Sequence, residues 1–278
     1  MNSIYRVVAL SVVTIYFLLT LMAALFQDRL VFSPSRVLSR TPSSIGLHYD
    51  TVSFPSLHGE HLSGWFITHP KPKFTLLFFQ GKGGNMSNHL PLIQLFHELQ
   101  VTVFIFDYQG YGKSEGLTCS EEKTRADALG AWYYLTRNRG IPEKKIIVFG
   151  RSLGAAIASQ LCTEINPMGL ILEAPFLSAK AMAKLLYPYF PSSLLLKYDF
   201  DNRKALPKLR LPKLILHSRD DQLVPFSHGK LLFDVALPPK QFTSLKGGHG
   251  NSFSVSNPTY TAAVSSFLNT LLQTPLKQ

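Results

Sequence analysis

Short apolar runs alternate with longer amphipathic stretches over most of the chain. The short runs have the length and composition of buried β-strands, and the stretches between them have the apolar spacing of helices. We expect strands over residues 74–79, 101–106, 145–149, 169–172, 213–217 and 241–245, and helices over residues 86–99, 120–137, 153–161 and 259–272. Ahead of them, residues 49–54 and 61–68 are predicted to form an antiparallel hairpin. The pattern predicts an α/β fold with a mostly parallel central sheet of about eight strands and helices on both faces.

One segment interrupts this alternation. Residues 177–211 are rich in prolines and aromatic residues and lie between two predicted strands. The interruption comes after a strand whose carboxyl end faces the edge of the sheet where ligands gather in such folds. We expect residues 177–211 to form a small cap of one or two helices over that edge.

The N-terminus carries the longest apolar run. Residues 7–26 contain no charged side chain, and about 20 residues at ~1.5 Å each are enough to cross a ~30 Å hydrocarbon layer. We interpret residues 1–27 as an uncleaved, single-pass membrane anchor, in preference to a signal peptide, whose apolar stretch usually has about 7–15 residues, or to a buried helix. Residues 28–47 are expected to be a linker and residues 48–278 the soluble domain. Arginines on both sides of the run leave the orientation open.

Composition narrows the class of partner. The formal net charge is +11, but the basic residues are scattered and no aromatic-basic module of a nucleic-acid binder is present. We therefore expect attraction to anionic lipid and no nucleic-acid partner. The two cysteines, Cys119 and Cys162, match no metal spacing or disulfide framework, so no metal and no cofactor are expected. A monomer is expected.

The motif Gly-x-Ser-x-Gly at 150–154 carries the clearest chemical signal. It follows a β-branched strand and opens an Ala-rich helix, which is the strand-to-helix turn of a nucleophile elbow with Ser152 at its apex. Gly150 and Gly154 would be needed because any Cβ there would collide with the neighbouring strand and helix. The free N–H groups of the following helix point at the turn.

A second Gly-x-Ser-x-Gly surrounds Ser114. Its preceding strand ends several residues too early and no helix opens after it, so we interpret Ser114 as part of a loop. A phosphate-binding loop at Gly112–Ser114 is excluded because the glycine that it needs five positions upstream is Asp107.

The partners that an elbow serine needs lie downstream, after the last two predicted strands. A serine hydroxyl needs a base and an orienting acid to act as a nucleophile at neutral pH. Asp220 and Asp221 follow one strand and His249 follows the next. The order serine, acid, histidine is that of an α/β-hydrolase. The residues alone do not choose between the two aspartates.

An oxyanion hole requires two backbone N–H donors. One is expected from Leu153, the residue after the nucleophile, and the other from the loop after the strand 74–79. Within that glycine-rich loop we predict the Lys82 N–H as the donor, with Gly81 as the rival.

Six ordered motifs resemble the α/β-hydrolase superfamily, and most closely its membrane-anchored serine hydrolases, the branch that includes protein depalmitoylases. They are FQGKGGN at 79–85, FDYQGYGKSEG at 106–116, GRSLG at 150–154, EAPF at 173–176, DQLVP at 221–225 and GH at 248–249. The resemblance implies nucleophile Ser152, acid Asp221 and base His249, because the family's acid is followed by two residues and then Val, often with Pro. It also implies ester or thioester substrates, often acylated lipids or proteins.

The resemblance has one departure and leaves further expectations. Gln80-Gly81-Lys82 stands where the family commonly has His-Gly-Asn, so a lysine at the mouth of the oxyanion hole could alter substrate preference. Gln80, Tyr108 and Tyr111 are expected to line or brace the substrate pocket. The predicted function is ester or thioester hydrolysis through an acyl-enzyme on Ser152, with a peptidase of the same fold or a non-catalytic binding module as alternatives.

Overall fold

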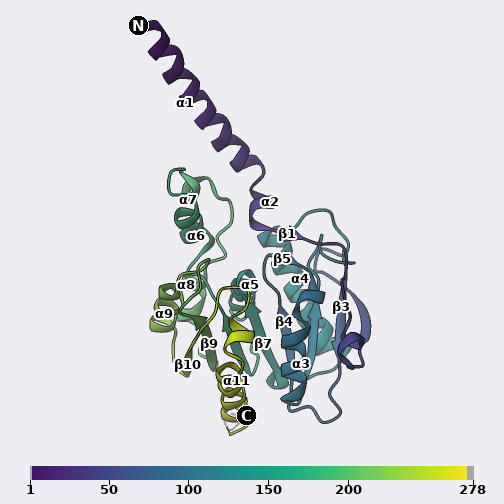
Figure 1. Cartoon of the computed structure of the whole chain (residues 1–278). Coiled ribbons are helices and arrows are strands. Elements are labelled where there is room, and N and C mark those ends of the chain that lie inside the picture. The colour runs from purple at the N-terminus through teal and green to yellow at the C-terminus, as the bar shows by residue number, and fades with distance from the viewer. Residues whose placement is uncertain (1, 274–278) are drawn as a thin grey trace.

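The computed structural model describes residues 2–273, and its centre is one eight-stranded sheet (Figure 1). The strand order is β10-β9-β8-β7-β4-β6-β3-β2; only β2 with β3 and β3 with β6 pair antiparallel. The strands are β2 (Asp50–Pro55), β3 (His61–Ile67), β4 (Phe74–Phe79), β6 (Val101–Phe106), β7 (Ile146–Arg151), β8 (Gly169–Glu173), β9 (Lys213–Ser218) and β10 (Lys240–Leu245). The predicted α/β fold with a mostly parallel sheet is confirmed.

Helices cover both faces of the sheet. Buried side chains of α4 (Glu121–Tyr133), α5 (Leu153–Leu161) and α9 (Phe226–Val235) belong to one apolar core. Those of α3 (Leu90–Glu98) and α11 (Asn257–Gln273) belong to a second core on the other face. A strand that is buried on both faces has a nearly continuous apolar sequence, as in β4 and β6, which are buried at every position.

Helix α9 has no counterpart among the predicted elements. Its sequence includes His228 and Gly229, which weaken the apolar spacing of a helix. The glycine has a tertiary reason, because a Cβ at Gly229 would collide with the ring of His217. Short helical turns complete the domain: η1 (Pro42–Ile45), η2 (Met86–His89), the π-turn η3 (Tyr134–Asn138), η4 (Glu143–Lys145), η5 (Leu206–Lys208) and α10 (Ser252–Val255).

A cap lies between β8 and β9. It contains three short helices, α6 (Ala179–Leu186), α7 (Ser192–Leu195) and α8 (Asn202–Ala205), where one or two were expected. Helix α8 packs on α5 of the domain, whereas α6 and α7 pack on each other. In Figure 1 the pair α6–α7 projects from the domain toward the side on which the N-terminal helix leaves it.

The N-terminal helix α1 (Asn2–Leu25) extends away from the domain (Figure 1). Its residues 3–25 are long and apolar enough to cross a membrane, with a mean hydropathy of 2.4, and none of the spanning window is buried in the protein. A short helix α2 (Gln27–Val31) follows it. The structure thus shows one N-terminal apolar helix, a feature that anchors and signal sequences share.

The segment after α2, which we term the strap (residues 32–38), contacts the domain closely. Strand β1 (Ser33–Pro34) pairs with β5 (Gly83–Gly84) in the loop after β4. Phe32 is buried in the first core, and the guanidinium of Arg36 donates hydrogen bonds to the carbonyls of Ser114 and Gly116. Part of the segment expected to be a linker is therefore held against the edge of the sheet where the predicted site lies.

Candidate active site

Ser152 occupies a strained turn between β7 and α5. Its φ of 54° and ψ of −116° lie in a region that side chains rarely adopt. A Cβ at Gly150 would collide with the backbone of Gly154 and Ala155, and a Cβ at Gly154 would collide with the carbonyls of Phe79 and Gln80. Both glycines are thus required by close approach, and the turn holds the serine hydroxyl above the carboxyl end of the sheet.

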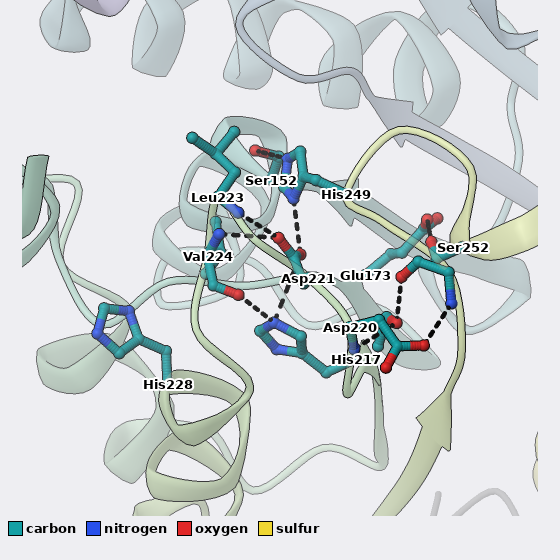
Figure 2. A network of polar contacts seen from close by, with 12 residues as sticks. Ser152, Glu173, His217, Asp220, Asp221, Leu223, Val224, His228, His249 and Ser252 are labelled. Carbon is teal, nitrogen blue, oxygen red and sulfur yellow. Dashed lines mark hydrogen bonds and ion pairs between the residues drawn. The ribbon is translucent and has the colours of Figure 1, made fainter.

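The three side chains predicted to form a triad meet in space (Figure 2). The Nε2 atom of His249 lies 3.0 Å from the Oγ atom of Ser152, and the Nδ1 atom of His249 lies 2.7 Å from the Oδ2 atom of Asp221. They come from loops after β7, β9 and β10, whose carboxyl ends share one edge of the sheet. The geometry allows the imidazole to accept the serine proton while the carboxylate holds the other ring nitrogen.

Asp221 is fixed as an ionised hydrogen-bond acceptor. Its Oδ1 atom accepts the backbone N–H groups of Leu223 at 2.9 Å and Val224 at 2.8 Å. Burial acts to raise the pKa of Asp221, but the hydrogen bond from His249 and these two N–H groups outweigh it and hold the pKa below its ordinary value. The carboxylate therefore carries its charge at neutral pH, when it must orient and stabilise the imidazole.

Asp220 points elsewhere. Its Oδ2 atom accepts the backbone N–H of Gly247 at 3.0 Å, and its side chain makes no contact with the imidazole in Figure 2. Asp220 thereby ties the loop after β9 to the loop after β10. Of the two adjacent aspartates, the one that contacts His249 is Asp221.

Ser114, the serine of the other Gly-x-Ser-x-Gly, is buried in a structural loop. Its hydroxyl donates to the carbonyl of Asp107 and accepts the N–H of Ser63. Both partners are backbone groups at the end of β6 and in β3, so this serine closes a loop and faces no base.

The loop after β4 lies beside the nucleophile. A Cβ at Gly81 would stand 3.6 Å from the Cβ of Ser152, and Lys82 borders the same cavity as Ser152 and Leu153. Leu153 is the first residue of α5, so its N–H has no partner within the helix. The structure thus brings Gly81, Lys82 and Leu153 to the serine, as an oxyanion hole requires.

Two buried tyrosines hold this loop from behind. The Tyr108 hydroxyl donates to the carbonyl of Gln80 at 2.9 Å, and the Tyr111 hydroxyl donates to the carbonyl of Lys82 at 2.6 Å. In the strap, the Ser33 N–H also donates a hydrogen bond to the Lys82 carbonyl, at 2.9 Å. Gln80, Tyr108 and Tyr111 do not border the cavity. The two tyrosines instead brace the loop, because their hydroxyls donate hydrogen bonds to its backbone carbonyls.

A buried carboxyl completes the brace. Asp107 accepts the Gln80 side-chain amide at 2.9 Å and the Met86 N–H at 2.8 Å, both on Oδ1. Its Oδ2 atom has no partner within residues 2–273. Burial raises the pKa of Asp107 to about 6, although these two hydrogen bonds and the charge of Arg36 act to lower it.

Arg151 positions the histidine loop, a role that was not predicted. Its Nη2 atom donates to the carbonyl of His249 at 2.9 Å, and its Nε atom lies 3.3 Å from Oε1 of the buried Glu173. Glu173 also accepts hydrogen bonds from Ser252 and Tyr260. The sequence did contain a signal for this role. An arginine stands inside the elbow motif, and a glutamate ends the next predicted strand, which would pair beside it in a parallel sheet.

Ser152 borders an apolar cavity of about 660 Å³. One wall comes from α1 and α2, including Leu19, Met22 and Ala23, and the facing wall comes from the cap. The cap residues are Phe176, Ala179, Met182, Ala183, Leu186, Tyr187, Phe190, Ser192, Leu195, Leu196 and Phe200. Among the residues that the structure describes, no carboxylate borders this cavity, and no group of His, Cys, Asp and Glu side chains is placed to hold a metal ion.

Comparison with known proteins finds a matching family model and relatives that cover most of the chain. A family model described as "Serine aminopeptidase, S33" matches residues 70–204, which include Ser152. The chain is 30% identical over 256 residues to the uncharacterized protein Rv2307c of Mycobacterium tuberculosis, covering 90% of this chain and 91% of that protein. It is 32% identical over 232 residues to the α/β hydrolase domain-containing protein WAV2 of Arabidopsis thaliana, covering 75% of each.

Solved structures show the same fold at lower sequence identity. The esterase Pf2001 of Pyrococcus furiosus superposes with a TM-score of 0.74 at 19% identity, covering 86% of this chain and 98% of that one. The esterase domain of a Rhodothermus marinus protein superposes with a TM-score of 0.61 at 21% identity, covering 79% of this chain and 98% of that domain. These similarities concern the arrangement of the sheet and its helices.

Proposed function

This chain belongs to the α/β-hydrolase superfamily, and we propose that it is a serine hydrolase that cleaves carboxylic esters or thioesters of apolar acyl groups. The observation that carries the proposal is the chain of contacts from Asp221 through His249 to Ser152, which borders an apolar cavity. A hydroxyl activated in this way attacks an acyl carbonyl, and an apolar cavity beside it accommodates the acyl chain.

The residues have defined roles in this mechanism. The Ser152 oxygen forms a bond to the acyl carbon while His249 takes the hydroxyl proton, and Asp221 holds the resulting imidazolium. The N–H groups of Leu153 and Lys82 stabilise the oxyanion, with Gly81 as the rival to Lys82. His249 then gives the proton to the departing alkoxide or thiolate. Water, deprotonated by His249, attacks the acyl-enzyme and releases a carboxylic acid and the free serine.

The walls of the cavity favour a lipid-like substrate. Helix α1 supplies part of the lining, so the cavity is complete only when the N-terminal helix stays attached. This supports a retained anchor and a substrate that shares the membrane with it, such as an acylated lipid or an acylated protein. The resemblance of six motifs to a branch that includes protein depalmitoylases points to the same substrate class.

Aminopeptidase activity is the second candidate, because the matching family model bears that description. An aminopeptidase must recognise a cationic amino terminus, for which carboxylates are the natural partners. The charged side chains that border the cavity within residues 2–273 are Arg29 and Lys82, which would repel such a substrate. We therefore expect amino-acid anilides to be turned over at least ~10-fold more slowly than acyl esters.

A fluorophosphonate probe tests the proposal on the full chain in detergent. We expect the wild type to be labelled, Ser152→Ala to be unlabelled, and Ser114→Ala, which alters the serine of the other Gly-x-Ser-x-Gly, to keep its labelling. Hydrolysis of p-nitrophenyl esters of rising chain length and of acyl-coenzyme A thioesters then defines the acyl group. A wild type that is folded by circular dichroism but neither labelled nor active on any ester would refute the enzyme and favour a binding module.

A further inference from the structure

The free end of the cap is an exposed apolar surface. We define the cap tip as residues 185–195, the end of α6, the connecting loop and α7. Tyr189 and Leu194 are 87% and 85% exposed, and four more apolar side chains of the tip are exposed: Leu185, Leu186, Tyr187 and Leu195. A contiguous apolar surface of this kind marks a site of contact with a protein or a membrane.

The cap tip lies beside the middle of α1. The hydroxyl of Tyr16 donates to the carbonyl of Tyr189 at 3.1 Å, and the rings of Tyr16 and Phe190 stack with centroids 5.4 Å apart. Tyr16 stands nine residues before Leu25, the end of α1, which is about 14 Å along a helix. If α1 crosses a hydrocarbon layer of ~30 Å, the cap tip lies near the middle of that layer.

Two ion pairs lie at the opposite end of the cap. Lys197 pairs with Asp28 at 2.6 Å and Lys180 pairs with Asp199 at 2.7 Å, both at the level where α1 gives way to α2 and the domain. Lys184 lies in the last turn of α6, next to the tip, and its flexible chain of methylenes can carry the ammonium back toward the headgroups. The cap is thus apolar where it would meet hydrocarbon and charged where it would meet headgroups.

Part of the backbone of the cap tip is paired within the protein. Irregular backbone in hydrocarbon is costly unless its polar groups are paired. Pro188 and Pro191 have no N–H, the Phe190 N–H donates to the Tyr187 carbonyl, and the N–H groups of Leu194 and Leu195 donate to the Pro191 carbonyl. The Ser192 hydroxyl donates to the carbonyl of Ala183 at 2.9 Å. These contacts pair part of the polar groups of the tip, whereas the Tyr189 N–H has no backbone partner within residues 2–273.

We propose that the cap tip is inserted in the same leaflet as the adjoining half of α1, so that the cavity between them opens sideways into the hydrocarbon. An acyl chain anchored in that leaflet then slides between α1 and the cap toward Ser152 without crossing water. The occupant of this surface is lipid rather than a second copy of the chain, because the adjoining stretch of α1 has the length and apolar composition of a segment that crosses hydrocarbon. The insertion rests on the position of the cap beside α1 and on α1 crossing the bilayer; only the entry of substrate rests on the proposed hydrolase function.

Tryptophan quenching tests the insertion. The two native tryptophans, Trp65 and Trp132, are buried in the domain, so they give a constant background in vesicles of phosphatidylcholine brominated at mid-chain. We expect the added fluorescence of Tyr189→Trp to fall by at least half relative to unbrominated vesicles, as should that of Phe17→Trp on α1. Leu272→Trp, an exposed position near the C-terminal end opposite α1 (Figure 1), serves as the matched control and should be unquenched.

Each other outcome contradicts the proposal. If Tyr189→Trp is unquenched while Phe17→Trp is quenched, the cap tip lies outside the bilayer and meets water, a second copy or another protein. If Phe17→Trp is also unquenched, α1 does not reside in the bilayer and the insertion fails with it. These readouts do not depend on catalysis, so they hold even if no hydrolase activity is found.

The entry of substrate is tested by comparing hydrolysis of an ester embedded in vesicles with hydrolysis of a soluble ester. We expect Leu194→Glu, a position outside the cavity lining, to lower hydrolysis of a palmitoyl ester embedded in vesicles by at least ~10-fold. Hydrolysis of soluble p-nitrophenyl butyrate and fluorophosphonate labelling should be unchanged. Leu272→Glu should change neither activity. An equal loss on both substrates, or no loss on the embedded one, would overturn sideways entry, whereas failure of the proposed function itself appears as a wild type without labelling.

Discussion

The two sides of the cavity are built in different ways. On the catalytic side, hydrogen bonds hold the site in place: Asp221 accepts two backbone N–H groups, and the carbonyls of Gln80 and Lys82 accept tyrosine hydroxyls. On the side of α1 and the cap the lining is apolar, and the polar contacts between them are few, such as that from Tyr16 to the Tyr189 carbonyl.

This difference assigns separate tasks to the two sides. Hydrogen bonds are directional and hold atoms at defined positions, as a nucleophile and an oxyanion hole require. Apolar contact depends on buried area rather than direction, so it selects a substrate by length and shape. We infer that substitutions on the catalytic side change the rate for every ester, and that substitutions on the cap side change which ester is used.

The largest effect is expected from the adjacent pair of aspartates. Asp221→Asn should lower kcat by roughly 10³–10⁴-fold for short and long acyl esters alike, because an amide in place of the carboxylate stabilises the wrong imidazole tautomer. Asp220→Asn, one residue away, should stay within about threefold of the wild type, because within residues 2–273 the hydrogen bond that its side chain makes is to the Gly247 N–H and not to His249. Similar losses in the two variants would contradict the assignment of the acid.

An intermediate effect is expected from the cap wall. Ala183→Phe places a ring in the cavity and should lower kcat/KM for a palmitoyl ester by about 10–100-fold, while an acetyl ester changes little. Leu185→Phe, on the same helix but outside the lining, provides the matched control and should leave the chain-length profile unaltered. A parallel loss on acetyl and palmitoyl esters would mean that the cap does not hold the acyl chain.

The smallest effect concerns stability and pH. The pKa of Asp107 is raised by burial from 3.8 to about 6, so between these pH values the folded state holds a proton that the unfolded state has released, and stability falls as pH rises. Asp107→Asn keeps the Oδ1 acceptor and lacks this titration. At pH 8 we expect the free energy of unfolding of Asp107→Asn to exceed that of the wild type by about 1–2 kcal/mol. This is part of the ~3 kcal/mol that the pKa shift represents.

Denaturant titrations of wild type and Asp107→Asn in the same detergent from pH 4 to 8 measure this effect. The difference between the two curves should grow from pH 4 to about pH 6 and then level off, because both states are ionised above the folded pKa. A difference that does not change with pH would mean that Asp107 is ionised throughout. The rate of ester hydrolysis should change by less than about threefold, since Asp107 contacts the side chain of Gln80 and not the N–H groups expected to hold the oxyanion.

The features that could be predicted from the sequence are those carried by neighbouring residues. Strands buried on both faces appear as continuous apolar runs, and a serine between two glycines at the end of such a run indicates an elbow. Candidate acid and base could be found because parallel strands bring their carboxyl ends to one edge. Helix α9 was not predicted because Gly229 weakens its helical pattern. The glycine is required there because a Cβ would collide with His217, which lies on a strand that the helix packs against.

Local sequence thus determined the α/β architecture, the position of Ser152 and the short set of residues that could complete its site. The tertiary structure decided that Asp221 rather than Asp220 faces the imidazole, that Tyr108 and Tyr111 brace a loop, and that α1 forms a wall of the cavity. The reason is distance along the chain: Tyr16 and Tyr189 are 173 positions apart, and no pattern within either segment records that folding brings them into contact.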